Sequence, residues 1–220
     1  APHVARIARL LRDQRPRFEV RVTFVDPDQV EPKNTIRQNF SPAECGRNKA
    51  VALAMRLSAA FGLPIAARPA AFAPPKTASG LLPVLIGCVD GPEGRRSLLA
   101  AVQRDNPAWW LDCGNEKNSG QVLLGGGWRD GQRLPGLVTW LPLPTEVHPD
   151  LLEDPAQAQK PLSCADLNAQ EGQGLAINAR MAAEAADYLV RLLLTGDLRK
   201  RATYIDLESG TARSVYCAQS

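Results

Sequence analysis

The residues from Phe18 to Val25, FEVRVTFV, alternate between apolar and polar side chains, which predicts a β-strand that ends at Asp26. No hairpin turn follows this strand. The chain passes instead through a connection broken by Pro27 and Pro32 and then enters a helical pattern. A strand, a helix and a further strand in this order require a crossover, and crossovers join parallel strands. The sequence therefore predicts a parallel sheet covered by helices.

One long helix is predicted from Ser41 to Gly62. Ser41 can serve as its N-cap, Pro42 suits the first helical position, and Glu44 completes a capping box. Gly62 supplies the stop, because glycine readily adopts the left-handed conformation that ends helices.

Apolar runs and helical patterns continue along the rest of the chain. We expect helices from residue 1, at 93–104 and at 175–194, strands at 81–89, 109–113, 121–124 and 137–141, and a hairpin at 204–216. Residues 64–80 and 142–162 contain several prolines and are expected to be loops. The predicted fold class is α/β, with a mixed, largely parallel sheet flanked by helices.

Composition argues against several classes of protein. The formal charge is only +3, and no long basic run or aromatic interleaving points to nucleic acid. No apolar stretch approaches the ~18 residues of a membrane span. The five cysteines are scattered and form no CxxC pair, which disfavours a structural zinc site and favours free thiols in the cytoplasm.

The connection VDPDQVEPKNTIRQNF gathers polar groups directly after the first predicted strand. A carboxylate at Asp26 can accept two hydrogen bonds from a ribose diol, and Arg37 and Lys49 can supply positive charge to phosphates. Asp90, which follows the apolar run LLPVLIGCV, can hold Mg²⁺. Each residue also has a structural interpretation, since Asp26 suits a turn, Lys49 a solvated helix face, and Arg37 with Gln38 a cap for loop carbonyls.

The order of these segments resembles the ThiF/MoeB/ubiquitin-activating-enzyme superfamily. Its pattern is a strand ending D-x-D-x-V, then N-x-x-R-Q, G-x-x-K-A and a strand ending C-x-D, and this chain has DPDQVEPKNTIRQNF, GRNKA and CVDG. The resemblance covers nearly the whole chain and implies a Rossmann-like adenylation fold. The C-terminal part, with PLSCAD and EGQGLAINARMAAEAADYLVRLL, is most similar to ThiF proteins of bacterial PRTRC-type and ubiquitin-like operons.

The resemblance implies an ATP and Mg²⁺ site within a single adenylation domain of residues 1–220. Asp26 would bind the ribose, and Asp90 would hold the Mg²⁺. The other residues implied to bind the nucleotide, with Arg37 also catalytic, are Asp28, Asn34, Arg37, Gln38 and Lys49. The implied reaction is adenylation of the C-terminal carboxylate of a ubiquitin-like protein, by a homodimer, with release of pyrophosphate.

Three departures from the family pattern bear on this reading. The family's G-x-G-G-x-G loop and its first strand are expected to precede Ala1, and ATP binding depends on their presence. Gly91 stands where Asn often follows the magnesium aspartate. The two CxxC zinc pairs of many members are absent.

Residues 142–165 are expected to form a crossover loop that carries Cys164, the candidate for a thioester with the activated protein. A thioester could then pass to a conjugating enzyme. The alternative for Cys164 is a role in core packing, the role that we also expect for Cys88 and Cys113 in their apolar strands.

Three other functions stay open from the sequence. One is a sulfur-carrier activator that forms no thioester of its own. Another is an inactive scaffold that binds a ubiquitin-like partner. The last is a nicotinamide oxidoreductase, which shares the ribose aspartate but has no use for Arg37, Gln38 and Lys49.

Overall fold

The computed structural model describes residues 1–74, 82–102, 107–128, 140–153 and 175–217, with only the backbone of Arg37 and Leu175. The chain divides into two compact units. Unit 1 comprises residues 1–72 and 189–195, and unit 2 comprises residues 73–188 and 196–220. The expected single domain of residues 1–220 stays a prediction.

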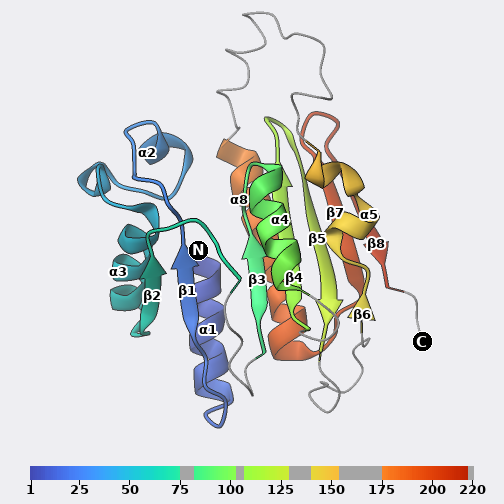
Figure 1. The fold of residues 1–220 in the computed structure, drawn as a ribbon, viewed down its shortest axis with the longest axis horizontal. Helices are drawn as coiled ribbons and strands as arrows, with labels where there is room; N and C mark the ends of the chain where they lie inside the picture. The colour runs from blue at the N-terminus through green and yellow to red at the C-terminus, as the bar shows by residue number, and fades with distance from the viewer. Residues whose placement is uncertain (75–81, 103–106, 129–139, 154–174, 218–220) are drawn as a thin grey trace, which may run out of the picture. The chain divides into compact units, whose positions relative to one another are not determined.

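Unit 1 contains two parallel strands and the helices that pack with them (Figure 1). The elements are α1 (Pro2–Gln14), β1 (Val22–Val25), α2 (Asn34–Arg37), the 3₁₀ turn η1 (Pro42–Glu44), α3 (Lys49–Phe61) and β2 (Ile65–Arg68). The core of the unit consists of Ala5, Ala8, Ala54, Leu57, Leu63 and Ile65. Half of these core residues are alanines, so α1 and α3 can approach each other and the strands closely.

Two predictions for unit 1 are wrong in part. The first strand begins at Val22 and not at Phe18, whose side chain is 65% exposed. Strand β2 lies within residues 64–80, which we expected to be a loop. It forms because Ile65 is buried in the core while its backbone pairs with β1, from Val22↔Ile65 to Val25↔Arg68. The prolines that suggested a loop lie outside this short strand.

The predicted helix from Ser41 to Gly62 is divided into η1 and α3. The capping box is confirmed, since the Glu44 carboxylate accepts from the backbone N–H of Ser41 at 2.7 Å. Gly46 then adopts φ +81°, which no helix accommodates. Gly46 donates its N–H to the carbonyl of Val30, and Val30 donates to the carbonyl of Arg47, both at 2.8 Å. Pairing with the earlier connection therefore replaces the helical hydrogen bonds.

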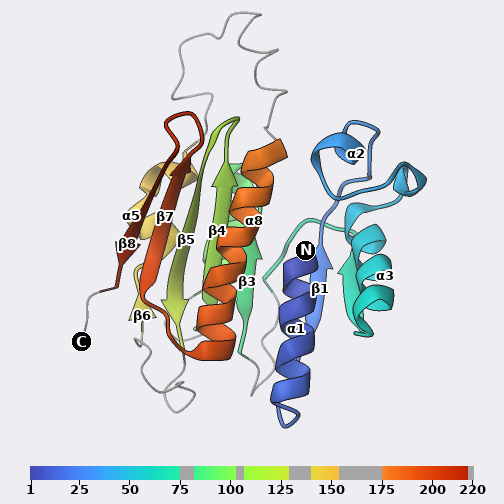
Figure 2. The same cartoon turned by 180° about the vertical axis from the view of Figure 1, so that it is seen from behind.

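Unit 2 is built on a six-stranded sheet (Figures 1 and 2). Its strands are β3 (Val84–Gly87), β4 (Trp109–Asn115), β5 (Ser119–Gly127), β6 (Trp140–Leu141), β7 (Lys200–Asp206) and β8 (Thr211–Tyr216). Helices α4 (Pro92–Ala101) and α8 (Leu175–Val190) cover opposite faces of this sheet, as the two views show. A π-helical turn, η3 (Arg191–Thr195), follows α8 and belongs to unit 1.

The sheet of unit 2 has the order β3-β4-β5-β7-β8, and β6 pairs with β5. Among the described strands of the whole chain, β1–β2 and β3–β4 are parallel and the other four pairings are antiparallel. The mixed α/β class with flanking helices is confirmed. The share of parallel strand pairings is smaller than the largely parallel sheet that we expected. The predicted apolar stripe of the last long helix is also confirmed, because all its residues are buried: Ile177, Met181, Ala185, Tyr188, Leu189 and Leu192.

Part of the segment 142–162, predicted to be a loop, is helical. It contains α5 (Pro144–Val147) and the 3₁₀ turn η2 (Pro149–Leu152). The Glu146 carboxylate accepts from the backbone N–H of Leu143 at 2.6 Å and so caps α5. None of the helices that the structure describes is long and apolar enough to cross a membrane.

A buried ion pair lies within unit 2, where the sequence suggested only an apolar strand. Asp112 on β4 is 0% exposed, and its carboxylate lies 3.3 Å from Nε of Arg95 on α4. Burial raises the pKa of Asp112, and Arg95 opposes that rise. The pair fixes α4 against β4, because separating the two residues would leave an uncompensated charge buried in the interior.

Candidate functional site

The candidate site begins at the carboxyl end of β1. Asp26 extends the pairing with β2, since its backbone N–H donates to the carbonyl of Arg68 at 3.2 Å. The chain then turns, and Oδ1 of Asp26 accepts from the backbone N–H of Asp28 at 2.9 Å. This turn places two carboxylates directly beyond the strand. Such ends are where open α/β sheets bind their ligands.

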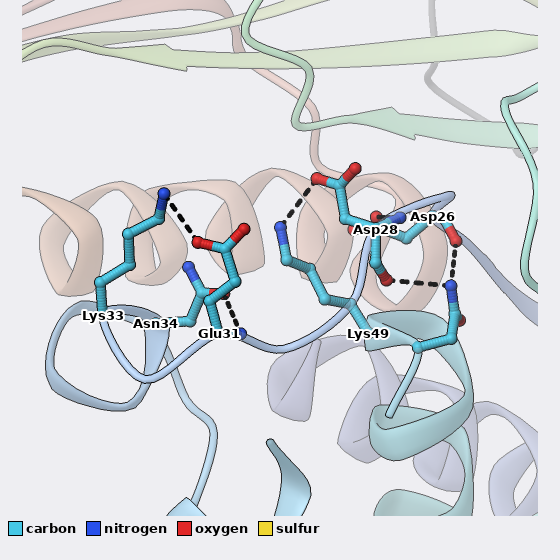
Figure 3. A network of polar contacts seen from close by, with 7 residues as sticks. Asp26, Asp28, Glu31, Lys33, Asn34 and Lys49 are labelled. Carbon is cyan, nitrogen blue, oxygen red and sulfur yellow. Dashed lines mark hydrogen bonds and ion pairs between the residues drawn. The ribbon is translucent and has the colours of Figure 1, made fainter. Parts of the chain in front are cut away.

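Lys49 lies beside the second of these carboxylates (Figure 3). Its Nζ is 2.9 Å from Oδ2 of Asp28, and its backbone N–H donates to the carbonyl of Asp28 at 2.8 Å. The side chain of Lys49 is 16% exposed, whereas that of Asp28 is 64% exposed. An ion pair with such an exposed carboxylate contributes little to stability. The backbone hydrogen bond and the contact with Asp28 position the ammonium group. Because the ion pair is weak, the group can still bind a phosphate.

Asn48 joins the strand end to the helix, and the sequence reasoning missed it. Its Nδ2 donates to the carbonyls of Asp26 and Asp28, at 2.7 and 3.0 Å. Its Oδ1 accepts from the backbone N–H of Val51 at 3.1 Å and so caps α3. One side chain thus fixes both sides of the site. An Asn directly before a helical run is a recognised N-cap signal, and this signal could have found Asn48.

Replacing Asn48 with alanine should lower the free energy of unfolding by about 2–3 kcal/mol, since one cap and two further hydrogen bonds are lost. Asn48→Ser is the matched variant, because serine is a good cap but cannot span to both carbonyls. We expect it to recover about 1 kcal/mol. Urea unfolding with an unchanged m-value measures both. Equal losses in the two variants would contradict the capping role.

The N-x-x-R-Q residues lie on the short helix α2 and just after it. Asn34 is 4% exposed, and its Oδ1 accepts from the backbone N–H of Glu31 at 2.8 Å (Figure 3). Its amide oxygen therefore shapes the connection. Gln38 is the C-cap residue of α2, and its backbone N–H donates to the carbonyl of Asn34 while its side chain is exposed. Only the backbone of Arg37 is described. The roles predicted for Arg37 and Gln38 toward phosphate stay predictions.

The remaining predicted site residues lie outside unit 1. Asp90 is an exposed residue that follows β3 in unit 2. Cys164 falls outside the described residues. Among the described residues, no group of three or more His, Cys, Asp or Glu side chains could hold a metal ion. Cys88, expected in the core, is exposed, because β3 ends one residue before it.

Comparison with known proteins identifies related folds. No model of a protein family matches the sequence, and no curated protein matches it. Among solved structures, E. coli MccB with ATP superposes with a TM-score of 0.57 at 15% identity, over 91% of this chain and 57% of MccB. MccB with AMPCPP and selenomethionine MccA gives 0.58 at 14% identity, over 100% and 62%. The selenomethionine form of PaaA gives 0.53 at 14% identity, over 89% and 56%.

The chain thus spans between 56 and 62% of the length of these three structures. At this level of identity the likeness concerns the arrangement of helices and strands, and it agrees with the α/β class expected from the sequence. The chain has the fold of MccB and PaaA.

Proposed function

We propose that this chain is an adenylating enzyme of the ThiF/MoeB/ubiquitin-activating superfamily. The observation that carries the proposal is the grouping of Asp26, Asp28 and Lys49 beyond β1, held together by Asn48. The fold shared with MccB, which has been solved with ATP and with AMPCPP, supports a nucleotide as the ligand. The order of the sequence motifs supports the same assignment.

In the proposed site, the carboxylate of Asp26 accepts hydrogen bonds from the ribose. Lys49, with Arg37 and Gln38, faces the phosphates, and Asn34 keeps the connection in shape. Asp90 is the residue that would hold Mg²⁺, since an exposed lone carboxylate suits an ion that takes its other ligands from phosphate and water. The bound ion would neutralise charge on the phosphates.

The proposed reaction joins a carboxylate to the α-phosphate of ATP. A carboxylate oxygen attacks the α-phosphorus, the bond to the bridging oxygen breaks, and pyrophosphate leaves with the electron pair. Charge gathers on the phosphoryl oxygens and on the leaving group, so fixed cations such as Lys49 accelerate the step. No side chain needs to move a proton, because the substrate carboxylate is already ionised.

The proposed substrate is the C-terminus of a ubiquitin-like or sulfur-carrier protein, and a homodimer is the proposed active form. In the thioester branch, the Cys164 thiolate attacks the acyl-adenylate and AMP leaves. A conjugating enzyme would then accept the acyl group. MccB has been solved with N-formylated MccA and with selenomethionine MccA, which supports a peptide or protein substrate more than a small acid.

Intact-protein mass spectrometry tests this proposal. The full-length protein is mixed with a candidate ubiquitin-like protein and with Mg-ATP, and mass spectra are recorded with and without thiol. We expect a partner-sized adduct that thiol removes and that is absent in Cys164→Ala. Cys217→Ala is the control, because a cysteine near the end of β8 should leave the adduct unchanged.

The other outcomes separate the alternatives. Release of AMP and pyrophosphate without an adduct would favour the sulfur-carrier activator and remove the thioester from the proposal. Neither an adduct nor ATP turnover, with the partner still bound, would favour the inactive scaffold and would overturn the enzymatic assignment.

A further inference from the structure

A single arginine holds the far end of the polar connection between β1 and α3. Arg56 on α3 donates from Nη2 to the main-chain carbonyl of Asn39 at 2.5 Å and from Nη1 to Oδ1 of the same residue at 3.5 Å. Its Nε is buried and lies 3.4 Å from Oε1 of Glu44. We propose that Arg56 is a positioning residue, which fixes the Asn34–Gln38 segment of the candidate nucleotide site without touching the nucleotide.

The geometry of α3 explains why one helix can hold both ends of the connection. Lys49 and Arg56 are seven residues apart, which is close to two helical turns, so they lie on the same face. The first turn of this face holds the outgoing end at Asp28. The third turn holds the returning end at Asn39 and Glu44. The connection is therefore fixed to one rigid helix at two points, Asp28 and Asn39.

The part of the returning end before Gly46, where the pairing with Val30 begins, depends on this contact because its own backbone hydrogen bonds are local. In the described hydrogen bonds, Gln38 donates to the carbonyl of Asn34 and Phe40 to that of Gln38, while Glu44 and Cys45 donate to carbonyls three residues earlier. Such bonds shape turns but do not place them against the rest of a protein. Arg56 supplies the contact to a regular element, the helix α3. It makes this contact at Asn39, which lies two residues after Arg37.

The charge and burial of Glu44 favour a specific positioning role for Arg56 over a nonspecific surface contact. Glu44 is 8% exposed, and its Oε2 is occupied by the N–H and hydroxyl of Ser41, at 2.7 and 3.1 Å. Its Oε1 faces Arg56, so one carboxylate joins the capped turn η1 to the guanidinium. Arginine suits this position because its planar fork can serve a carbonyl and a carboxylate together, whereas lysine offers one point charge.

The inference deepens the proposed function and rests on it for the nucleotide, but hydrogen–deuterium exchange tests the positioning without any ligand. In the full-length protein, Arg56→Met keeps the aliphatic stem and removes the donors. We expect amide exchange in residues 34–45 to become roughly tenfold faster, as expected for the loss of a charged hydrogen bond, while exchange in α1 and β2 stays the same. Arg56→Lys should restore part of the protection.

Two control variants sharpen the test. Asn39→Ala removes only the 3.5 Å side-chain contact and leaves the main-chain carbonyl, so it should leave exchange nearly unchanged. Arg21→Met removes an exposed arginine of the same unit, paired with Glu19, and should change neither exchange nor activity. Unchanged exchange in Arg56→Met, or faster exchange throughout unit 1, would overturn the positioning role.

Nucleotide measurements then separate this inference from the proposed function. We expect Arg56→Met to lower kcat/KM for ATP-dependent pyrophosphate exchange by about tenfold to a hundredfold, with partial recovery in Arg56→Lys. Faster local exchange with unchanged kinetics would show that the fixed segment does not serve the nucleotide, and this would overturn the inference alone. A parent protein that binds no ATP would overturn the proposed function, while the exchange data still decide whether Arg56 fixes the segment.

Discussion

Replacing Lys49 with alanine is expected to lower ATP-dependent pyrophosphate exchange by at least about 10²-fold, the usual cost of removing one donor that stabilises transition-state charge. The ammonium of Lys49 is held by its place in the first turn of α3, next to Asp28. A cation already in position needs no reorganisation when charge develops on the phosphates. Radioactive pyrophosphate exchange with saturating partner measures the effect.

The fold should tolerate this change. Alanine is the best helix former, and Asp28 remains solvated because its side chain is 64% exposed. Lys33→Ala is the matched control, since Lys33 is an exposed lysine of the same connection, paired with Glu31 at 2.7 Å. Near-normal exchange in Lys49→Ala would remove Lys49 from the site. An equal loss in Lys33→Ala would attribute the effect to the net charge of the region.

The second large effect concerns stability. Arg95→Met should lower the free energy of unfolding by about 3–5 kcal/mol, because it leaves the fully buried carboxylate of Asp112 without its cation. Arg96→Met is the matched control on the next residue. Arg96 is exposed and donates to the carbonyl of Leu152, so its loss should cost about 1 kcal/mol. Chemical denaturation of the two variants gives the comparison.

The pH dependence of Arg95→Met distinguishes an uncompensated charge from lost contacts. Without Arg95, the pKa of Asp112 should rise further above its ordinary value, since the largest influence that opposes burial is then lost. Between the pKa of the unfolded chain and this higher folded pKa, the folded state binds more protons. Stability then falls as pH rises, so the deficit should shrink in acid. A deficit independent of pH would contradict this explanation, as would failure of Arg95→Met/Asp112→Leu to recover stability.

Local patterns in the sequence predicted much of the fold. The buried stripe of α8 followed from helical periodicity alone, and the closing hairpin followed from two strand-like segments on either side of the turn at Glu208–Gly210. The capping box at Ser41 and Glu44 was also predicted correctly. Each of these features depends on residues within a few positions of one another. Asp26 and Lys49 could be singled out because their spacing matched a family pattern.

Contacts between distant residues decided the rest. The helix predicted from Ser41 is interrupted at Gly46 because residues 46–49 pair with residues 28–30, and no local propensity encodes that pairing. The same pairing brings Lys49 to Asp28 across 21 positions of the sequence. Asp112 is buried only because Arg95 lies over it on another element.

The sequence by itself thus determined the α/β class, several of the longer helices and strands, and which residue types stand at the end of β1. The tertiary structure alone decided that Asn48 and Arg56 hold the connection to α3. The physical reason lies in the nature of these contacts. Every residue has a main-chain carbonyl, so a side chain that donates to one depends on where its partner lies and not on the residue type of that partner. The location of the partner is set only when the chain has folded.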